Sequence, residues 1–256
     1  AGQPAPRPSV VSRQSSRNYE TVLTEEQLAA WHKKISGAEL VAFDTETTSL
    51  DQLSAELVGL SFAVEAGAAT YIPLAHRYAG APDQLDRAAV LARLKPWLED
   101  AGRAKLGQNT KYDMHVLANH GIRLAGAAHD TLLQSYVLES HQSHDMDDLA
   151  QRHLGLKTIT YDDVTGKGAG RIGFEQVAVE RAAEYAAEDA DVTLQLHQAL
   201  YPRVQSDEKA ARIYREVEMP LVTVLFSMER HGVLIDREQL KRLSTLFGER
   251  MGEIGK

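Results

Sequence analysis

The sequence contains no cysteine, which excludes disulfide bonds and thiolate-bound metals. It has no apolar run near the roughly 18 residues that a membrane-spanning helix requires. Residues 1–17 lack the apolar core of a secretory signal. The net charge of -8 argues against broad, nonspecific coating of nucleic acid. Together these absences indicate a cytoplasmic protein with no membrane partner.

The composition that remains is typical of a globular protein. Its 256 residues suffice for one large domain, or for one domain and a piece of another. Residues 1–17, rich in Pro, Ser, Gln and Arg, predict a flexible linker. The pattern changes near residue 205, and a final amphipathic helix, which Asp236 is expected to cap, has no evident partner for its apolar face. The residues after 205 therefore indicate the opening of a second domain.

Hydrophobic periodicity predicts short strands alternating with longer helices. Strands are expected at residues 40–43, 57–64, 69–74 and 105–108, the first three as an antiparallel meander. Helices are expected at residues 25–35, with a Thr24–Gln27 capping box, and at 85–98, 112–120, 131–138, 146–154, 174–200, 207–230 and from 237 onward. Residues 158–173, rich in glycine, predict a mobile loop, and residues 231–236 predict a turn into a short strand. The order favours an α/β fold, a mixed sheet with an antiparallel meander flanked by helices.

The first predicted strand ends in two acidic residues, Asp44 and Glu46. Residues i and i+2 of a strand point to the same face, so the two carboxylates lie side by side. Such a pair repels itself and raises the pKa of both groups unless a positive charge lies between them. A hard divalent cation such as Mg²⁺ suits oxygen ligands of this kind. A strand that ends in a solvated acidic loop is the alternative interpretation.

Three further acidic stretches could contribute to the same site. Asp113 falls in the first turn of a predicted helix, where it either faces a ligand or complements the helix dipole. Tyr185 and Asp189 lie four residues apart and share one helix face. Near residues 144–147, Asp145 is more simply explained as a helix cap than as a metal ligand. A solvated acidic face is expected for the other acids of the 184–191 stretch, which are Glu184, Glu188 and Asp191.

Three segments, 43–47, 107–113 and 185–189, together resemble the three exonuclease motifs of the proofreading domain of bacterial DNA polymerase I. That domain belongs to the DEDD exonuclease superfamily, and Tyr185 indicates its tyrosine subgroup. The similarity runs from about residue 18 to the end, because residues 218–221 and 232–233 resemble the start of the polymerase thumb. Relatives carry a basic residue where this chain has Ser143, which leaves a phosphate contact at that position open.

The resemblance implies a ribonuclease H-like fold and removal of nucleotides from a single-stranded or frayed 3′ end of DNA. It divides the chain into a linker (1–17), an exonuclease domain (18–203) and the start of a polymerase domain (204–256). It implies two divalent metal ions, Mg²⁺ with Mn²⁺ or Zn²⁺ as alternatives, that act on the attacking and leaving oxygens. Their ligands would be Asp44, Glu46, Asp113 and Asp189, and Tyr185 would orient the attacking water. Substrate contacts are expected from Thr45, Leu50, Gln108, Asn109 and Tyr112.

Two other functions compete with this interpretation. An RNA 3′-exonuclease of the same superfamily would share the carboxylates, but the thumb-like residues after 204 argue against it. An inactive DNA-binding module would have lost carboxylates, whereas all four and Tyr185 are present. No polymerase motif precedes Lys256, so we expect no nucleotide addition by this chain alone. The parent would be a bacterial, nucleoid-associated DNA polymerase that works as a monomer, with DNA and the rest of its polymerase domain as partners.

Overall fold

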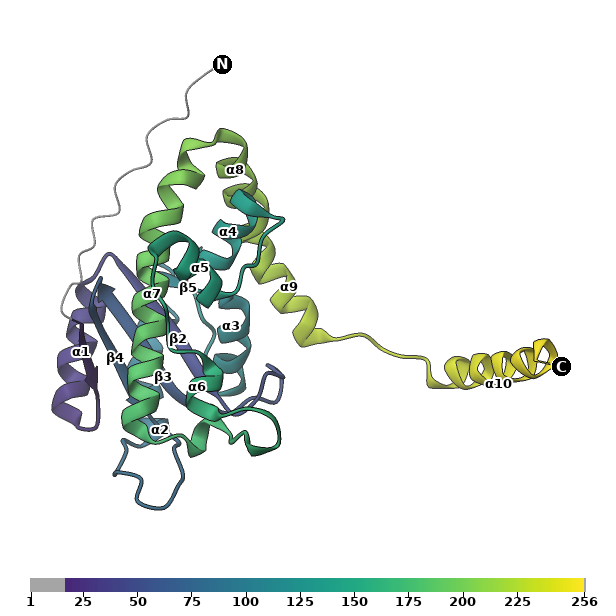
Figure 1. Cartoon of the computed structure of the whole chain (residues 1–256), viewed down its shortest axis with the longest axis horizontal. Coiled ribbons are helices and arrows are strands. Elements are labelled where there is room, and N and C mark those ends of the chain that lie inside the picture. Colours follow the sequence, from purple (N-terminus) through teal and green to yellow (C-terminus); the bar gives the residue numbers. More distant parts are fainter. Residues whose placement is uncertain (1–16, 256) are drawn as a thin grey trace.

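The computed structural model describes residues 17–255, which form a layered α/β structure with a mixed six-stranded sheet (Figure 1). The strand order is β1-β4-β3-β2-β5-β6. The antiparallel meander predicted from the sequence is confirmed, and its strands are β2 (Leu40–Thr47), β3 (Leu57–Glu65) and β4 (Ala68–Pro73). The flanking strands all pair in parallel, namely β1 (Asn18–Thr21) with β4, β5 (Ala104–Gly107) with β2, and β6 (Ala127–Asp130) with β5.

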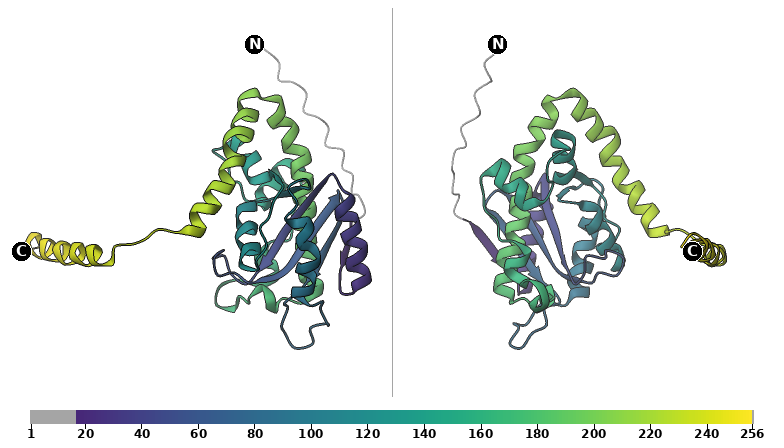
Figure 2. Two further views of the ribbon diagram at one scale, coloured as in Figure 1. Left: turned by 180° about the vertical axis from the view of Figure 1, so that it is seen from behind. Right: turned by 45° about the vertical axis from the view of Figure 1, so that its right-hand side comes forward.

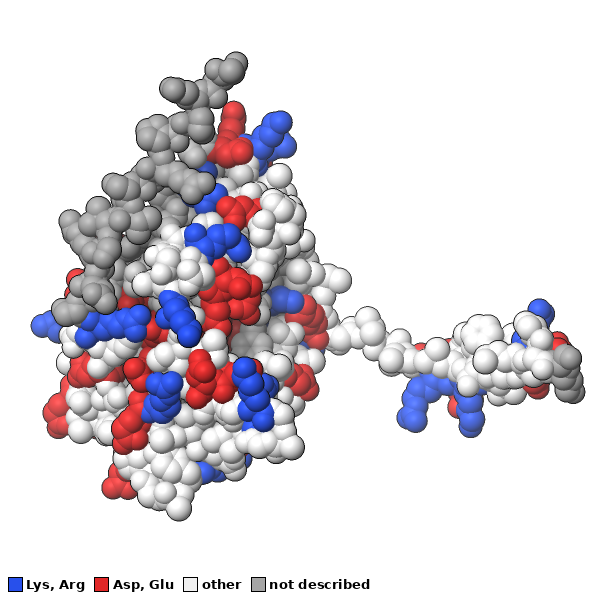
Figure 3. Space-filling view, in the orientation of Figure 1, with Lys and Arg blue, Asp and Glu red and all other residues white. Residues whose placement is uncertain are grey.

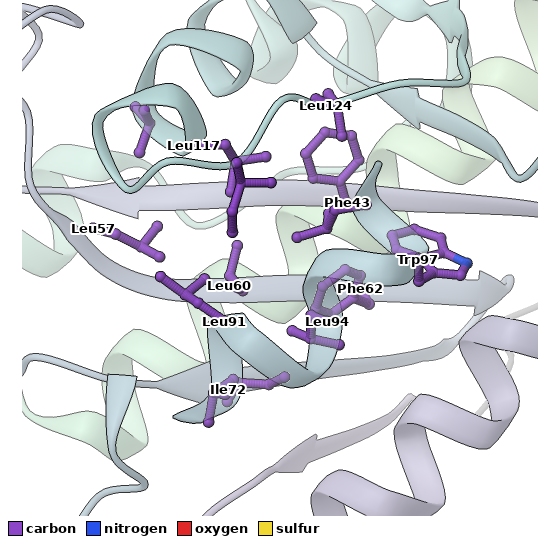
Figure 4. Close-up of a cluster of buried hydrophobic side chains, with 14 of the residues drawn as sticks. Phe43, Leu57, Leu60, Phe62, Ile72, Leu91, Leu94, Trp97, Leu117 and Leu124 are labelled. Carbon is purple, nitrogen blue, oxygen red and sulfur yellow. The ribbon is translucent and has the colours of Figure 1, made fainter. Parts of the chain in front are cut away.

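One face of the sheet is covered by three helices, α1 (Glu25–Gly37), α2 (Arg87–Leu98) and α3 (Thr110–Asn119). The main core lies between them and the sheet, and Phe43, Phe62 and Trp97 are among its buried side chains (Figure 4). The rings of Phe62 and Trp97 meet edge to face, with centroids 6.0 Å apart. The capping box predicted for α1 is present, because Gln27 N donates to Thr24 Oγ1 and Gln27 Oε1 accepts from Thr24 N.

The opposite face is covered by one long helix, α7 (Val179–Ser206), which lies on the far side of the sheet when the molecule is viewed from behind (Figure 2). Its contact surface is built of small residues, and Ala187 and Ala190 pack on Ala42 of β2. Small side chains allow a helix to approach a sheet closely. Since side chains alternate along a strand, β2 turns Ala42, Asp44 and Glu46 toward α7 and its intervening residues toward the main core.

The remaining helices are α4 (Thr131–Glu139), α5 (Met146–Leu149) with a π-helical turn (Ala150–Leu154), α6 (Tyr161–Thr165), α8 (Glu208–Ile213) with a π-helical turn (Tyr214–Glu218), α9 (Met219–His231) and α10 (Arg237–Ile254). Of these, α6 packs on the N-terminal part of α7, whereas α4 and α8 contact α7 further along and the chain then continues into α9 and α10. Two 3₁₀ turns, Gly168–Gly170 and Phe174–Gln176, precede α7. α10 stands apart from the sheet in all views, and none of its residues is buried (Figures 1 and 2). Within residues 17–255, no helix is long and apolar enough to cross a membrane.

Three sequence predictions about these elements are wrong. Residues 158–173 are not one loop, because Thr160 and Asp163 form a capping box that starts α6. The helix expected from 174 begins at Val179, since the residues just before it form a 3₁₀ turn. Residues 232–236 have no regular structure, so the short strand expected there is absent. The linker predicted at residues 1–17 falls almost entirely outside the described residues, and the domain boundary near 204 stays a prediction.

Candidate active site

Two carboxylates lie at the carboxyl end of the central strand, on the face that α7 covers. Asp44 and Glu46 are two residues apart on β2, whose pairing with β3 shifts register between Glu46 and Thr47. Asp189 reaches them from α7 and is only 4% exposed. One oxygen from each of these three side chains lies within 4.8 Å of the other two. The sequence prediction that these three acids converge therefore agrees with the structure.

Asp113 approaches the same strand end from the other face of the sheet. It lies in the first turn of α3, and its Oδ1 accepts a hydrogen bond of 2.7 Å from Thr45 Oγ1. Thr45 stands between Asp44 and Glu46 in sequence and therefore points the opposite way. Asp113 stays outside the group of three close carboxylates. Burial, and then the charge of Asp44, raises the pKa of Asp113 well above its usual range, and the charge of Asp113 adds to the raised pKa of Glu46.

The start of α3 is fixed by an unusual backbone and a buried acid. Asn109, just before the helix, has a φ of 65°, a left-handed conformation that asparagine tolerates better than most residues. Asp130, at the end of β6, accepts the backbone N–H groups of Asn109 at 3.2 Å and of Thr110 at 2.8 Å. These bonds hold the first turn of α3 against the sheet and so determine where Asp113 lies.

Within the described part of the chain, the four carboxylates have no cationic partner. Among residues 17–255, no Lys, Arg or His forms an ion pair with Asp44, Glu46, Asp113 or Asp189. Burial, followed by mutual repulsion, raises the pKa of Glu46 and of Asp189 well above its usual range. Glu46 Oε1 and Asp189 Oδ1 are buried and have no hydrogen-bond partner. Oxygen donors that are buried, unpaired and mutually repelling fit a bound divalent cation.

Tyr185 lies one turn before Asp189 on the same helix. Burial and the negative charge of Asp189 raise its pKa well above 10, so its hydroxyl stays protonated near neutral pH. Phe174 and Tyr161 enclose its ring, at centroid distances of 5.8 Å and 6.3 Å. The sequence analysis did not single out these two aromatic residues. Tyr161 lies within the Gly-rich stretch and Phe174 directly follows it. An aromatic residue in such a polar stretch needs a surface to pack on, and this was the available signal that the two residues contact the rest of the domain.

The five predicted substrate contacts differ in how free their side chains are. Leu50 is 92% exposed and follows β2 in the loop of residues 48–56. Asn109 is also exposed. Thr45 is engaged with Asp113, and Tyr112 bonds the Ser49 carbonyl at 2.6 Å. The amide of Gln108 donates to the His144 carbonyl at 2.9 Å and accepts from the Thr131 hydroxyl. Substrate contact by these residues stays a prediction.

The acidic stretches outside the site are structural. Asp145 caps α5 by accepting from Asp147 N at 3.0 Å, which confirms the capping interpretation. The solvated face expected around α7 is wrong for two acids, because Glu188 and Asp191 are each 1% exposed. They bind neighbouring segments, since Glu188 accepts from Ile159 N at 2.6 Å and Asp191 accepts from the Tyr19 hydroxyl and Gly67 N, both at 2.8 Å. Glu184 is exposed as expected.

Residue 143 also has a basic neighbour. Arg152 Nη2 donates to the Ser143 carbonyl at 2.8 Å, and its Nε donates to Glu139 Oε2 at 3.1 Å. A guanidinium therefore lies beside the position where the sequence comparison expected a basic side chain. Because Glu139 already pairs with the guanidinium of Arg152, this guanidinium is less available to a phosphate.

Comparisons with known proteins agree with this geometry. The model of a family described as 3′-5′ exonuclease matches residues 19–205. DNA polymerase I of Pseudomonas aeruginosa is 52% identical over 241 residues, which make up 93% of this chain and 26% of that protein. DNA polymerase I of Rhizobium leguminosarum is 40% identical over 244 residues, covering 88% of this chain and 24% of that protein. The chain thus spans about a quarter of the length of these relatives.

Solved structures agree on the fold. The polymerase domain of Pol1 from M. smegmatis, in complex with DNA primer-template and dNTP, has a TM-score of 0.72 at 23% identity, covering 91% of this chain and 36% of that one. Escherichia coli RNase D, an exoribonuclease, has a TM-score of 0.58 at 17% identity, covering 85% of this chain and 52% of that one. These likenesses confirm the predicted ribonuclease H-like architecture. With the family model over most of its length and relatives above 30% identity, the chain belongs to the 3′-5′ exonuclease family found in bacterial DNA polymerase I.

Proposed function

We propose that this chain hydrolyses the terminal phosphodiester at the 3′ end of DNA, with divalent cations held by its four carboxylates. The observation that carries the proposal is the group of Asp44, Glu46 and Asp189, each of which offers one oxygen within 4.8 Å of the other two. Hydrolysis of an anionic phosphodiester needs positive charge near the scissile phosphate. Carboxylate oxygens are hard ligands, which favour Mg²⁺ or Mn²⁺. We assign the first ion to these three residues.

A second ion is assigned to Asp44 and Asp113. Asp113 faces the strand end from the opposite side, and the hydroxyl of Thr45 fixes one of its oxygens. When bound, two such ions neutralise charge on the phosphate and lower the pKa of a coordinated water. The protein itself supplies the positions of the ligands, which come from β2, α3 and α7 and are held by the packed sheet between these helices.

Tyr185 orients the attacking water in this proposal. Its raised pKa makes the phenol a hydrogen-bond donor and a poor base at neutral pH. Glu46, which is buried beside Asp44, accepts the other hydrogen bond of the water. The aromatic rings of Tyr161 and Phe174 pack against the ring of Tyr185 and restrict its movement.

The substrate is a single-stranded or frayed 3′ end. Leu50 is exposed just beyond the carboxylate strand, where it can insert beside the last base. Contacts of this kind depend on stacking and on the sugar-phosphate backbone, so they do not discriminate between base sequences. On the face in Figure 3, Lys and Arg are interspersed with Asp and Glu, without one continuous basic surface for a long duplex.

Digestion of a 5′-labelled oligonucleotide tests the proposal. We expect stepwise shortening from the 3′ end with Mg²⁺ or Mn²⁺ and none with Ca²⁺ or excess chelator. Frayed duplex ends should be shortened faster than paired ones, because a paired terminus must first be melted. An RNA oligonucleotide of the same sequence separates this activity from that of an RNA 3′-exonuclease. Undiminished cleavage in chelator, or a preference for RNA, would contradict the proposal.

The residues after 204 belong, in this proposal, to the start of a polymerase domain. The relatives named DNA polymerase I are about four times as long as the matched region, and the match continues past the exonuclease family's limit at residue 205. We propose that the whole protein is a DNA polymerase whose partners are DNA and its own polymerase domain. The chain of 256 residues alone should not extend a primer, and nucleotide addition by it would overturn this division of labour.

A further inference from the structure

One carboxylate late in the chain joins two segments of the site. Glu229 lies on α9, and three donors bind its side chain. Its Oε1 accepts from Lys111 Nζ, and its Oε2 accepts from His115 Nε2 at 2.8 Å and from Gln52 Nε2 at 3.0 Å. Lys111 and His115 belong to α3, whereas Gln52 belongs to the 48–56 loop. The carboxylate of Glu229 thus bonds α3 through both oxygens and the loop through Oε2.

A second set of bonds connects the same three segments. Arg230, next on α9, donates from Nη1 to Asn119 Oδ1 at 2.7 Å. Asn119, the last residue of α3, donates from Nδ2 to the carbonyls of Gln52 at 3.0 Å and Ala55 at 3.1 Å. The loop is therefore held by α9 directly and by α9 through α3.

α9 is itself packed against the main core, so the side chains that make these bonds start from a fixed helix. Val222 is 7% exposed and belongs to the main core. The ring of Phe226 packs on the ring of His115, with centroids 4.6 Å apart. A polar contact from an anchored helix restrains the position of its partners, whereas one from a free helix would follow them.

The loop exposes Leu50 almost fully and Leu53 about half, while its backbone and polar groups are held. Tyr112 of α3 binds the Ser49 carbonyl at 2.6 Å, and Glu229 binds Gln52 on the other side of Leu50. Leu50 lies between these two attachments and is 92% exposed. An exposed leucine alone is ordinary. The loop is bonded to α3 on both sides of Leu50, at Ser49 and at Gln52, so the position of this leucine relative to α3 is restrained.

We propose that Glu229 is a positioning residue for the terminal nucleotide, because it holds the loop that presents Leu50 at a fixed place relative to Asp113. The inference rests on the proposed function and adds a residue that touches neither substrate nor metal. Loss of Glu229 releases the loop from α9 and leaves the carboxylates of β2 and α7 in place. We therefore expect weaker binding of the 3′ end.

The test compares steady-state kinetics of Glu229→Ala with those of the parent chain, on single-stranded DNA with saturating Mn²⁺. We expect KM to rise about tenfold, which corresponds to one lost set of charged hydrogen bonds. We expect kcat and the Mn²⁺ concentration for half-maximal activity to stay within about twofold, since the carboxylates are untouched. Glu216→Ala, an exposed glutamate on the π-helical turn before α9, is the matched control and should leave KM unchanged.

A double-mutant cycle with Leu50→Ala separates positioning from general stability. If Glu229 acts through Leu50, the double variant should raise KM little more than either single variant. Independent, multiplying effects on KM, or an unchanged KM in Glu229→Ala, would overturn the inference. If Glu229→Ala does not fold, Arg230→Ala probes the same loop through Asn119 and must show the same coupling. A parent chain that leaves 3′ ends intact would instead disprove the proposed function.

Discussion

At the scale of single residues, three consecutive side chains of β2 serve both faces of the sheet. Asp44 and Glu46 turn toward α7 and meet Asp189, whereas Thr45 turns the other way and holds Asp113. The alternation of a strand thus places carboxylates from two layers around one strand end. A threonine is suited to the middle position because its hydroxyl can donate to a carboxylate while its methyl packs in the core.

The proposed roles of Tyr185 and Asp189 predict different kinetic losses. Asp189→Ala removes a metal ligand, so single-turnover cleavage should fall on the order of 10³-fold or more. Tyr185→Phe removes one hydrogen bond to the water, worth about 10- to 150-fold, and should keep a near-normal metal dependence. Single-turnover rates over a metal titration measure both effects.

Both residues share one helix face, so a distortion of α7 would affect the two variants alike. Equal inactivity of the two variants would contradict the assigned roles, as would full activity of Asp189→Ala. Glu184→Ala is the control, because Glu184 is exposed on the same helix and lies outside the site.

The site could be largely predicted from the sequence, whereas its supports could not. Asp44, Glu46, Asp113 and Asp189 stand in recognisable motifs, and the three closest of them converge as expected. The bond between Thr45 and Asp113 joins residues that are 68 positions apart, and the bonds of Glu229 reach even further. No local pattern encodes such partners, because they depend on how α3 and α9 pack on the sheet. The burial of Glu188 and Asp191 escaped prediction for the same reason.

At the scale of elements, short segments decide where the longer ones lie. β1 and β6 have four residues each and were not predicted, since neither contains an apolar run long enough to give a period. Each is stabilised by its neighbours in the sheet. β6 ends at Asp130, which accepts bonds from the start of α3 and also caps α4 through Leu132 N at 2.9 Å. The long meander strands and α7 could be predicted because their periodicity extends over many residues.

Replacing Asp130 should therefore disturb two helices at once. Asp130→Ala removes the acceptor for the N–H groups of Asn109 and Thr110 and the cap of α4. We expect the free energy of unfolding to fall by about 2–4 kcal/mol, the sum of a lost cap and of buried donors left unpaired. Denaturant unfolding measures the loss.

Activity should fall as well, because Asp113 lies in the first turn of α3 and would shift with it. Asp145→Ala is the matched control, since Asp145 caps only the short helix α5 and makes no bond to α3. A stability loss no larger than that of Asp145→Ala would contradict the central role of Asp130.

At the scale of the whole molecule, folding brings together negative charges that an extended chain keeps apart. Burial raises the pKa of Asp44, Glu46, Asp113 and Asp189 above the values of the unfolded chain. A folded state with raised pKa values binds more protons than the unfolded state. Without metal, the stability that these four groups contribute is therefore fully present below about pH 4, near their unfolded pKa values, and is lost as the pH rises toward and through their folded pKa values.

The free energy of unfolding in chelator should accordingly fall between about pH 5 and pH 8, by about 1.4 kcal/mol for each unit of pKa difference, and the melting temperature should fall with it. Added Mn²⁺ should reverse the loss, and more strongly at pH 8 than at pH 5. Asp44→Asn removes one buried charge, so at pH 8 in chelator it should melt above the parent, and it should lose the response to Mn²⁺.

Calorimetry at several pH values, with and without metal, tests this dependence. Glu184→Gln serves as the control, because its side chain is exposed on α7. A metal-free melting temperature that rises with pH would contradict the sign of the effect.

The separation of the ligands along the chain has a consequence for the kinetics of folding. β2 and α3, which supply three of the four carboxylates, are separated in sequence by β3, β4, α2 and β5, and α7 follows only after β6, α4, α5 and α6. No single segment offers a complete cation site, so the cation meets its full set of ligands only after these elements have docked. Mn²⁺ should therefore slow unfolding and leave the refolding rate nearly unchanged, a difference that stopped-flow traces in both directions would reveal. A cation bound in this way would stabilise the folded state after its elements have docked and would not help to nucleate folding.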